Sequence, residues 1–131
     1  MRLLLDTHIW IWSVLEPQRL SPSLSHILGF HDHEKWLSPV SAWELGLLIE
    51  KGRFRSPWSA AAWIEKARQQ VGWREAPFTS DVALQAIATP LSWRDPADRL
   101  LVATARWYGL TLVTADHKIL AANICALLPN R

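Results

Sequence analysis

Apolar segments recur along this chain between short polar or proline-containing breaks, and the first segment lies at the N-terminus. Residues 3–5 form an uninterrupted run of three leucines. A short apolar run without alternation is typical of a strand buried on both faces, as in a parallel sheet. The run ends at Asp6, and both Asp6 and Thr7 are residue types that favour a helix N-cap. We therefore predict a strand at residues 3–5 and a helix at residues 8–15.

The remaining segments continue this alternation. A capping residue followed by proline marks three helix starts, at Ser38-Pro39, Ser56-Pro57 and Asp95-Pro96. Further strands are predicted at residues 34–37, 73–76, 110–113 and 124–127, and further helices at residues 23–28, 39–51, 57–71, 80–88, 97–108 and 117–122. Strands that alternate with helices imply βαβ units, and so an α/β fold around a mainly parallel sheet.

Composition places the chain among ordinary globular domains. Its 131 residues are 50% hydrophobic and 20% charged, which suits a single domain over residues 1–131. The single cysteine, Cys125, excludes an internal disulfide and fits a reducing compartment. Asp6 interrupts the N-terminal run too early for a signal peptide and no apolar stretch reaches ~18 residues, so we expect a soluble, cytoplasmic protein. The formal charge of +2 permits a polyanionic partner without demonstrating one.

Tryptophan is unusually frequent, with nine in this short chain. Its amphipathic ring often lies half-buried at the edge of a core, which is one explanation. Tryptophan is also enriched at protein–protein surfaces, which is the other. Both explanations stay open at the level of the sequence.

Eight of the twelve acidic residues have ordinary positions. Seven lie in predicted loops or on polar helix faces, and Asp95 lies at a predicted helix cap. The other four carboxylates lie near the ends of strands or inside helices. Asp6 ends the first strand, Glu44 lies inside an otherwise apolar helix, Asp98 is near a helix start, and Asp116 follows the fourth strand. In parallel βαβ units the helix starts lie at the C-terminal edge of the sheet, where open α/β sheets bind ligands. We therefore predict that Asp6, Glu44, Asp98 and Asp116 converge there.

Helix capping is the competing explanation, because Asp near a helix N-terminus satisfies free N–H groups. Asp95 and Asp98 have capping-box spacing, and Glu44 has it too if the helix begins at Ser41. A start at Ser38-Pro39 suits the preference for proline at the first helical position better, and it puts Glu44 beyond capping range. Thr7, as the residue that starts the first helix, could take over the cap and leave the oxygens of Asp6 free.

Four carboxylates within ~5 Å of one another would repel by roughly 3 kcal/mol per ionised pair at an effective dielectric of ~20. Such a cluster requires protons or cations. Oxygen ligands without cysteine or a histidine pair select Mg²⁺ or Mn²⁺. An ion held there can activate a water and neutralise charge on a phosphodiester, so the chemistry implied is metal-dependent phosphodiester hydrolysis.

Four blocks of the sequence resemble the signature motifs of PIN-domain proteins, and most closely those of VapC-type toxins. The blocks are Leu3-Leu4-Leu5-Asp6-Thr7-His8, Ser38-Pro39-Val40-Ser41-Ala42-Trp43-Glu44-Leu45, Asp95-Pro96-Ala97-Asp98-Arg99-Leu100-Leu101-Val102-Ala103-Thr104-Ala105 and Leu112-Val113-Thr114-Ala115-Asp116. They occur in order across essentially the whole chain. The family pattern often has an aromatic residue in place of Ala97, a departure that does not touch the acids.

The resemblance implies a three-layer α/β/α sandwich and an Mg²⁺- or Mn²⁺-dependent endoribonuclease that is inhibited by a cognate antitoxin. The family's acidic positions fall on Asp6, Glu44, Asp98 and Asp116. RNA and the antitoxin are then the expected partners, and the excess of tryptophan adds a homodimer to the expectation.

Several further residues are weaker candidates. Arg99 and Lys118 lie close in sequence to the acids and could hold an RNA backbone, as could Arg94, while Trp93 could stack a base. Thr114 could hold a metal-bound water or cap the following helix. Asp95 could be a metal ligand or support one, but its position before Pro96 favours N-capping. Lys51, Arg53 and Arg55 form a short basic run, in which Lys51 is interpreted as an exposed solubilising charge. His31-Asp32-His33 is interpreted as a solvated loop at the opposite edge of the sheet.

Two other functions are compatible with a carboxylate after the first strand. Asp6 could be a phospho-acceptor, but a receiver domain would carry adjacent acids there, and His8 occupies the place of the second acid of a phosphatase loop. The chain could also be a non-enzymatic α/β interaction module in which every one of these acids is a cap.

Overall fold

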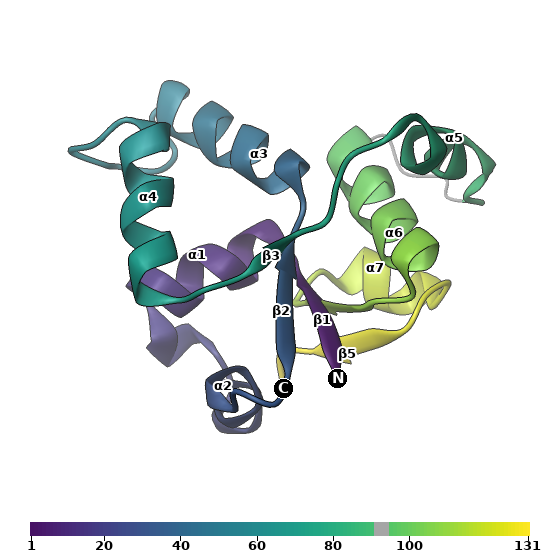
Figure 1. The fold of residues 1–131 in the computed structure, drawn as a ribbon, viewed down its shortest axis with the longest axis horizontal. Helices are drawn as coiled ribbons and strands as arrows, with labels where there is room; N and C mark the ends of the chain where they lie inside the picture. Colours follow the sequence, from purple (N-terminus) through teal and green to yellow (C-terminus); the bar gives the residue numbers. More distant parts are fainter. Residues whose placement is uncertain (91–94) are drawn as a thin grey trace.

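A parallel sheet forms the centre of the molecule (Figure 1). The computed structural model describes residues 1–90 and 95–131, and within them five strands form one sheet in the order β3-β2-β1-β4-β5. Every neighbouring pair is parallel. The strands are β1 (Arg2–Leu5), β2 (Glu34–Leu37), β3 (Arg74–Glu75), β4 (Thr111–Thr114) and β5 (Leu127–Pro129). The predicted parallel α/β fold is confirmed.

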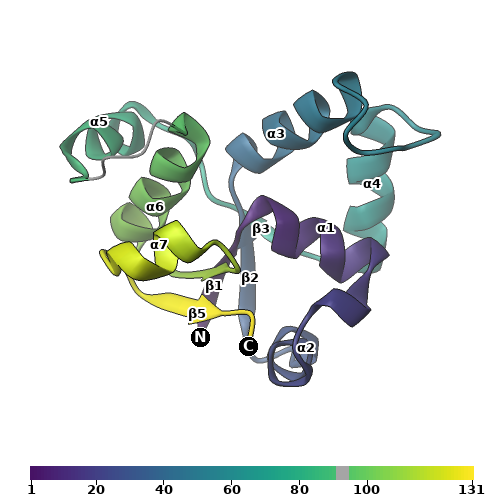
Figure 2. The ribbon, with the colours of Figure 1, turned by 180° about the vertical axis from the view of Figure 1, so that it is seen from behind.

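Helices cover both sides of this sheet, as Figures 1 and 2 show from opposite directions. One side carries α1 (Thr7–Leu15), α2 (Pro22–Gly29), α3 (Pro39–Glu50) and α4 (Ala60–Gln70), with a short 3-10 turn at Pro17–Arg19. The other carries α5 (Ser80–Ala88), α6 (Pro96–Tyr108) and α7 (His117–Ala122). The α/β/α sandwich implied by the family resemblance is therefore confirmed as well.

Strand β1 is central because both of its faces are buried. Leu3 and Leu5 belong to the apolar cluster formed with α1, α2, α3 and α4. Leu4 points the opposite way, into the cluster formed with α6 and α7. Successive side chains of a strand face opposite sides, so an unbroken leucine run is what a strand between two helical layers needs.

Capping residues set most helix starts where the sequence predicts them. Ser38 is the N-cap of α3 and Asp95 is the N-cap of α6, each followed by proline at the first helical position. Helix α6 ends at Gly109, whose backbone is left-handed with φ +65°. Glycine adopts this conformation without steric cost, which is why it ends helices so often.

Helix α4 begins three residues later than predicted. Its N-cap is Ser59, whose side chain accepts a hydrogen bond from the backbone N–H of Ala62. The hydroxyl of Ser56 instead accepts from the N–H of Trp58 and donates to the carbonyl of the same residue. Ser56 therefore closes a local turn, and a cap-then-proline pair is not by itself sufficient to start a helix.

Strand β5 also lies further along the chain than the predicted segment 124–127. Asn123 ends α7 in a left-handed conformation with φ +48°, so the chain needs several residues to return to the sheet. The first bond to β4 is donated by the N–H of Leu112 to the carbonyl of Ala126. Pro129 is inside β5, where an edge position tolerates the missing N–H.

The described tryptophans fall into three groups. Trp10 and Trp63 are buried and pack edge-to-face, with ring centroids 5.1 Å apart. The half-buried ones are Trp12, Trp36 and Trp73, and the exposed ones are Trp43, Trp58 and Trp107. The core-edge explanation thus accounts for only part of the set. Trp93 lies outside the described residues.

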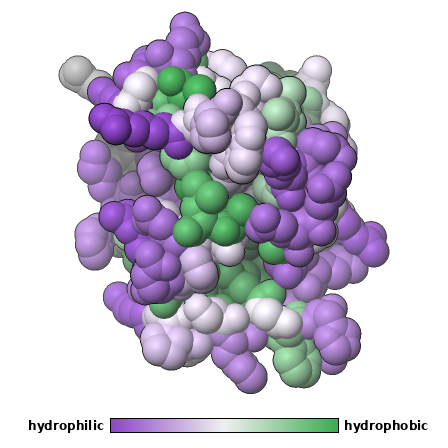
Figure 3. All heavy atoms as spheres, turned by 90° about the vertical axis from the view of Figure 1, so that its left-hand side faces the viewer, coloured by the Kyte–Doolittle hydropathy of each residue, from purple (hydrophilic) through white to green (hydrophobic). Residues whose placement is uncertain are grey.

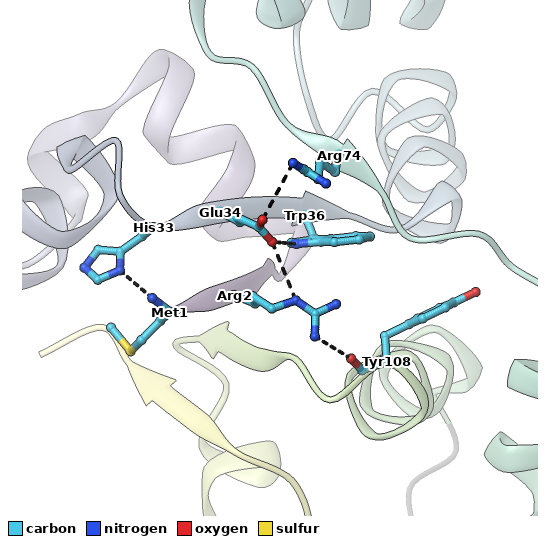
Figure 4. Close-up of polar contacts among 7 residues, drawn as sticks. All are labelled: Met1, Arg2, His33, Glu34, Trp36, Arg74 and Tyr108. Carbon is cyan, nitrogen blue, oxygen red and sulfur yellow. Dashed lines mark hydrogen bonds and ion pairs between the residues drawn. The ribbon is translucent and has the colours of Figure 1, made fainter.

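A polar network joins three strands near the N-terminal edge of the sheet (Figure 4). The carboxylate of Glu34 lies 3.5 Å from Arg2 and 3.6 Å from Arg74, and it accepts a 3.1 Å hydrogen bond from Trp36. Arg2 also donates to the carbonyl of Tyr108. These contacts tie β1, β2 and β3 together and attach the sheet to α6.

The His31-Asp32-His33 loop lies at the same edge, before β2. Nδ1 of His33 is 2.7 Å from the N-terminal amine, and the ring of His31 is exposed. The loop is thus remote from the C-terminal edge where the acids are predicted, as expected.

The face that carries α4 shows apolar side chains gathered in a stripe between polar ones (Figure 3). Val14, Leu15, Trp58 and Trp63 line a hollow on the α1–α4 side of the molecule. No helix in the described part of the chain is long and apolar enough to cross a membrane.

Replacement of Leu4 by alanine tests the importance of the central strand. Leu4 is fully buried, so Leu4→Ala should lower the free energy of unfolding by about 2–5 kcal/mol. Leu84 is 67% exposed on α5, and the matched Leu84→Ala control should change it by about 0.5 kcal/mol or less. Urea denaturation monitored by circular dichroism measures both, and similar losses for the two variants would contradict this account.

Candidate active site

The strand order places a crevice at the C-terminal edge of the sheet, between β1 and β4. The chain leaves β1 into α1 on one side of the sheet and leaves β4 into α7 on the other (Figure 1). Such a topological switch point is where open α/β sheets bind their ligands. Asp6 directly follows β1, and Asp116 lies two residues after β4.

A pocket of about 280 Å³ lies at this position and contains all four predicted acids. Its walls are formed by Asp6, His8, Trp12, Glu44, Asp95, Asp98, Ala115 and Asp116. The acids come from four separate segments of the chain. The structure therefore brings together the carboxylates that the sequence predicts to converge.

Asp6 is the most firmly held of the four. Its side chain is only 8% exposed; Oδ1 accepts a 2.7 Å bond from the N–H of Thr7, and Oδ2 accepts a 2.6 Å bond from the hydroxyl of Thr114. Burial raises the pKa of Asp6 above its ordinary value, and the bonds from Thr114 and Thr7 partly oppose that rise. Asp6 itself is the N-cap of α1, so the prediction that Thr7 takes over the cap is wrong.

Thr7 instead holds Glu44. Its buried hydroxyl donates to Oε1 of Glu44 at 2.5 Å and lies 2.9 Å from Oγ of Ser41. Because α3 begins after Ser38, Glu44 is in the second turn and is no part of a capping box. Burial is the main cause of the raised pKa of Glu44, and the charges of Asp6 and Asp95 add to it.

Asp116 caps the helix that follows it with one of its two carboxylate oxygens. Oδ1 accepts bonds from the N–H groups of Lys118 and Ile119, at 2.8 and 3.2 Å, so Asp116 caps α7. This cap does not use Oδ2. The backbone N–H of Asp116 donates to the hydroxyl of Thr114, which in turn donates to Asp6. Thr114 therefore connects the ends of β1 and β4.

Asp98 is the carboxylate that capping explains least. The cap of α6 is made by Oδ1 of Asp95, which accepts a 3.0 Å bond from the N–H of Ala97. Burial, followed by the charges of Asp95, Asp116, Asp6 and Glu44, raises the pKa of Asp98 from 3.8 to about 7. The neighbouring negative charges thus all disfavour ionisation of Asp98.

The donor chemistry suits Mg²⁺ or Mn²⁺, because the pocket offers carboxylate oxygens and no thiolate. As the side chains lie, no three or more His, Cys, Asp or Glu residues of the described chain form a group that could hold an ion. The acids share the pocket, but they do not form a closed coordination shell. Three of them, Asp6, Glu44 and Asp116, have an oxygen already engaged by a hydroxyl or backbone donor.

Comparison with known proteins matches residues 3–124 to the family described as the PIN domain. The curated relative ribonuclease VapC22 of Mycobacterium tuberculosis is 38% identical over 117 residues, which are 88% of each chain.

The chain belongs to the PIN-domain family.

Solved structures support the same fold at low sequence identity. DNA-bound VapBC from Salmonella typhimurium has a TM-score of 0.70 at 15% identity, with 100% of this chain and 99% of that chain covered. VapBC2 from Rickettsia felis, bound to a DNA fragment from its promoter, has a TM-score of 0.69 at 14% identity and 98% coverage of both chains. FitAcB from Neisseria gonorrhoeae has a TM-score of 0.66 at 22% identity and 96% coverage of both chains.

The three residues predicted to bind substrate lie in different environments of this PIN domain. Arg99 is turned away from the pocket, because its guanidinium donates to the carbonyls of Ala86 and Thr89 at the end of α5. Neighbouring residues of a helix do not share a face, so closeness to Asp98 in sequence was misleading. Thr114 is fully buried and positions Asp6. Lys118 is exposed on α7 and stays a prediction.

Four other residues make contacts at this site that the sequence did not predict. His8 and Trp12 line the pocket, and the hydroxyls of Thr7 and Ser41 adjoin Glu44. His8 and Trp12 are four residues apart in α1. With Asp6 as the N-cap, this spacing alone places them one turn apart on the same helix face. Trp93 and Arg94, which were predicted near the acids, lie outside the described residues.

The Thr114 hydroxyl can be removed with little change of shape by Thr114→Val. This leaves a buried oxygen of Asp6 and the N–H of Asp116 without their partner, so the free energy of unfolding should fall by about 1–3 kcal/mol. Thr114→Ser keeps the hydroxyl and should be markedly more stable than the valine variant. Chemical denaturation tests this, and equal stability of the two variants would show that Thr114 does not hold Asp6.

The raised pKa of Asp98 predicts a pH dependence of stability in the absence of divalent ions. Between pH 3.8 and about 7 the folded protein keeps a proton that the unfolded chain has released, so stability falls as the pH rises through this window. Asp98→Asn lacks this loss. The variant should therefore match the parent near pH 4 and be more stable at pH 8.

Urea denaturation in EDTA at both pH values provides the measurement, with Asp81→Asn, an acid in the first turn of α5, as the control. If Asp98 were only a helix-terminal charge, Asp98→Asn would instead lower the free energy of unfolding by up to ~1 kcal/mol at pH 8.

Proposed function

We propose that this PIN domain is a metal-dependent endoribonuclease that hydrolyses RNA phosphodiester bonds and acts as the toxin of a toxin–antitoxin pair. The observation that carries the proposal is the acidic pocket at the switch point of the sheet, where Asp98 has a pKa of about 7 because it is partly buried among four other carboxylates. Negative charge concentrated in this way is what a divalent cation neutralises.

Asp6, Glu44, Asp98 and Asp116 are the residues proposed to hold Mg²⁺ or Mn²⁺. An ion bound there would lower the pKa of a water molecule and offset negative charge on the phosphate under attack. Thr114 keeps Asp6 directed into the pocket, and Thr7 does the same for Glu44. The cap of α7 uses only Oδ1 of Asp116, so that residue can cap the helix and still offer Oδ2 to the pocket.

The relatives support the choice of substrate and partner. The curated relative is named a ribonuclease, and the solved structures include toxin–antitoxin complexes, two of which are bound to DNA in the examples above. We accordingly propose RNA as the substrate and a cognate antitoxin as the inhibitor, with residues 1–131 acting as one nuclease domain. A homodimer and a cytoplasmic location complete the proposal.

Two rival functions are less compatible with the site. A receiver-type phospho-acceptor would carry adjacent acids after the first strand, whereas Asp6 is followed by Thr7 and His8. A non-enzymatic module would use the acids as caps, yet Asp95 rather than Asp98 caps α6, and Glu44 lies beyond capping range.

Cleavage of a structured RNA tests the proposal directly. The parent should cut with Mg²⁺ or Mn²⁺ and lose activity in EDTA. Asp6→Asn and Asp98→Asn should each lose more than the ~10–100-fold typical of groups that only support a metal ligand. Asp32→Asn changes an exposed acid at the opposite sheet edge and should cut like the parent. Undiminished cutting in EDTA, or by the two pocket variants, would refute the metal-dependent mechanism.

A further inference from the structure

The acidic pocket attracts cations but cannot by itself attract RNA. Its described walls include five carboxylates and no lysine or arginine. A nucleic acid binds largely through its phosphates, and this needs positive charge close to the site of cleavage. The nearby Arg99 is engaged at the end of α5 instead. Another surface has to hold the strand that leads into the pocket.

A second hollow, of about 310 Å³, adjoins the acidic pocket and shares His8 and Trp12 with it. Its other walls include Arg19, Arg53 and Phe54. It therefore combines two cations and one carboxylate, Glu16, with aromatic rings, while the pocket beside it combines five carboxylates. The two hollows meet along one face of α1, where His8 and Trp12 lie one turn apart with ring centroids separated by 6.0 Å.

The cations of this second hollow are accessible. The guanidinium of Arg19 lies over the Trp12 ring, 5.2 Å from its centroid, and is paired with Glu16 at 2.8 Å. The Arg19 side chain is still 57% exposed. Arg53 is exposed and has no ion-pair partner within the described residues. The guanidinium of Arg19 therefore lies on the Trp12 ring while more than half of the Arg19 side chain stays exposed.

We propose that this second hollow, lined by His8, Trp12, Arg19, Arg53 and Phe54, is a subsite for the single-stranded RNA segment that flanks the scissile phosphate. An unpaired base stacks on Trp12 and the guanidinium of Arg19, as bases do on aromatic rings and arginine planes. Arg53 contacts the adjoining phosphate. The inference rests on the proposed ribonuclease function and deepens it by naming where the substrate strand lies.

This arrangement has a consequence for selectivity. Every base has a π-face, so stacking on Trp12 is tolerant of sequence. A duplex keeps its bases stacked inside and cannot offer one to the ring. The subsite therefore selects unpaired RNA over double-stranded RNA and contributes affinity rather than the choice of base.

Binding of a short, unstructured, fluorescein-labelled RNA, measured by fluorescence anisotropy in EDTA, separates this subsite from catalysis. The double variant Arg19→Ala/Arg53→Ala should raise Kd about 10-fold at low salt. It should also lower the slope of log K against log salt by about 0.7 for each phosphate that the variant no longer neutralises. Trp12→Leu should weaken binding about 10-fold at every salt concentration, because stacking is not ionic. Its folding is checked by circular dichroism.

Arg68→Ala/Arg74→Ala is the matched control. It also removes two charges and two cation–π interactions, over Trp73 and Trp36, but away from both hollows. Its Kd should stay within about twofold of that of the parent. Equal Kd values for the two double variants would overturn the subsite. The subsite would also be overturned if Arg19→Ala/Arg53→Ala keeps the parental Kd for RNA but no longer binds the co-expressed antitoxin. The surface would then be a protein contact.

The proposed function is judged separately, by whether the parent cuts RNA with Mg²⁺ or Mn²⁺. A parent that cuts while Arg19→Ala/Arg53→Ala keeps the parental Kd and KM would refute the subsite alone. A parent that binds RNA through this hollow but never cuts it would refute the nuclease and retain the subsite. A parent that does not bind single-stranded RNA would refute the subsite outright.

Discussion

Burial of the Asp6 carboxylate is the constraint on which the rest of the site depends. A carboxylate at the end of a strand enclosed by two helical layers loses most of its hydration, and this loss is tolerable only if other groups satisfy its oxygens. The N–H of Thr7 and the hydroxyl of Thr114 do so. Because those donors come from α1 and from the end of β4, Asp6 connects the sheet to the pocket, and any shift of β4 against β1 breaks a buried hydrogen bond.

The same logic of shared donors extends to the other acids. Each is anchored by an element that leaves the C-terminal edge of the sheet, and the hydroxyls of Thr7 and Thr114 lie between neighbouring acids. Capping and ligand binding are therefore not exclusive explanations here. Asp116 uses one oxygen for its helix, while Asp95 makes the cap that leaves Asp98 free of that task. Repulsion among these groups remains, and it is the stored electrostatic cost that a cation would relieve.

The sequence was sufficient for the order of elements, the parallel sheet and the convergence of the four acids, because each depends on local signals and on one topological rule. It was insufficient where a side chain could make either of two sets of contacts. Ser56 was predicted as the cap, but the turn around Trp58 moves the start of the helix to Ser59. Arg99 was predicted to bind substrate beside the acids, but its guanidinium donates to a carbonyl of α5 instead. The second hollow could not be predicted, since Arg19 and Arg53 reach it from distant segments.

Both borders of the sheet are short and poorly suited to extension. Strand β3 has two residues, and β5 includes Pro129, which lacks the N–H that a further strand would need. An outside strand therefore finds little backbone to pair with, which protects the protein from edge-to-edge aggregation. A second copy or an inhibitor would therefore find side-chain surfaces rather than free strand backbone at both edges of the sheet.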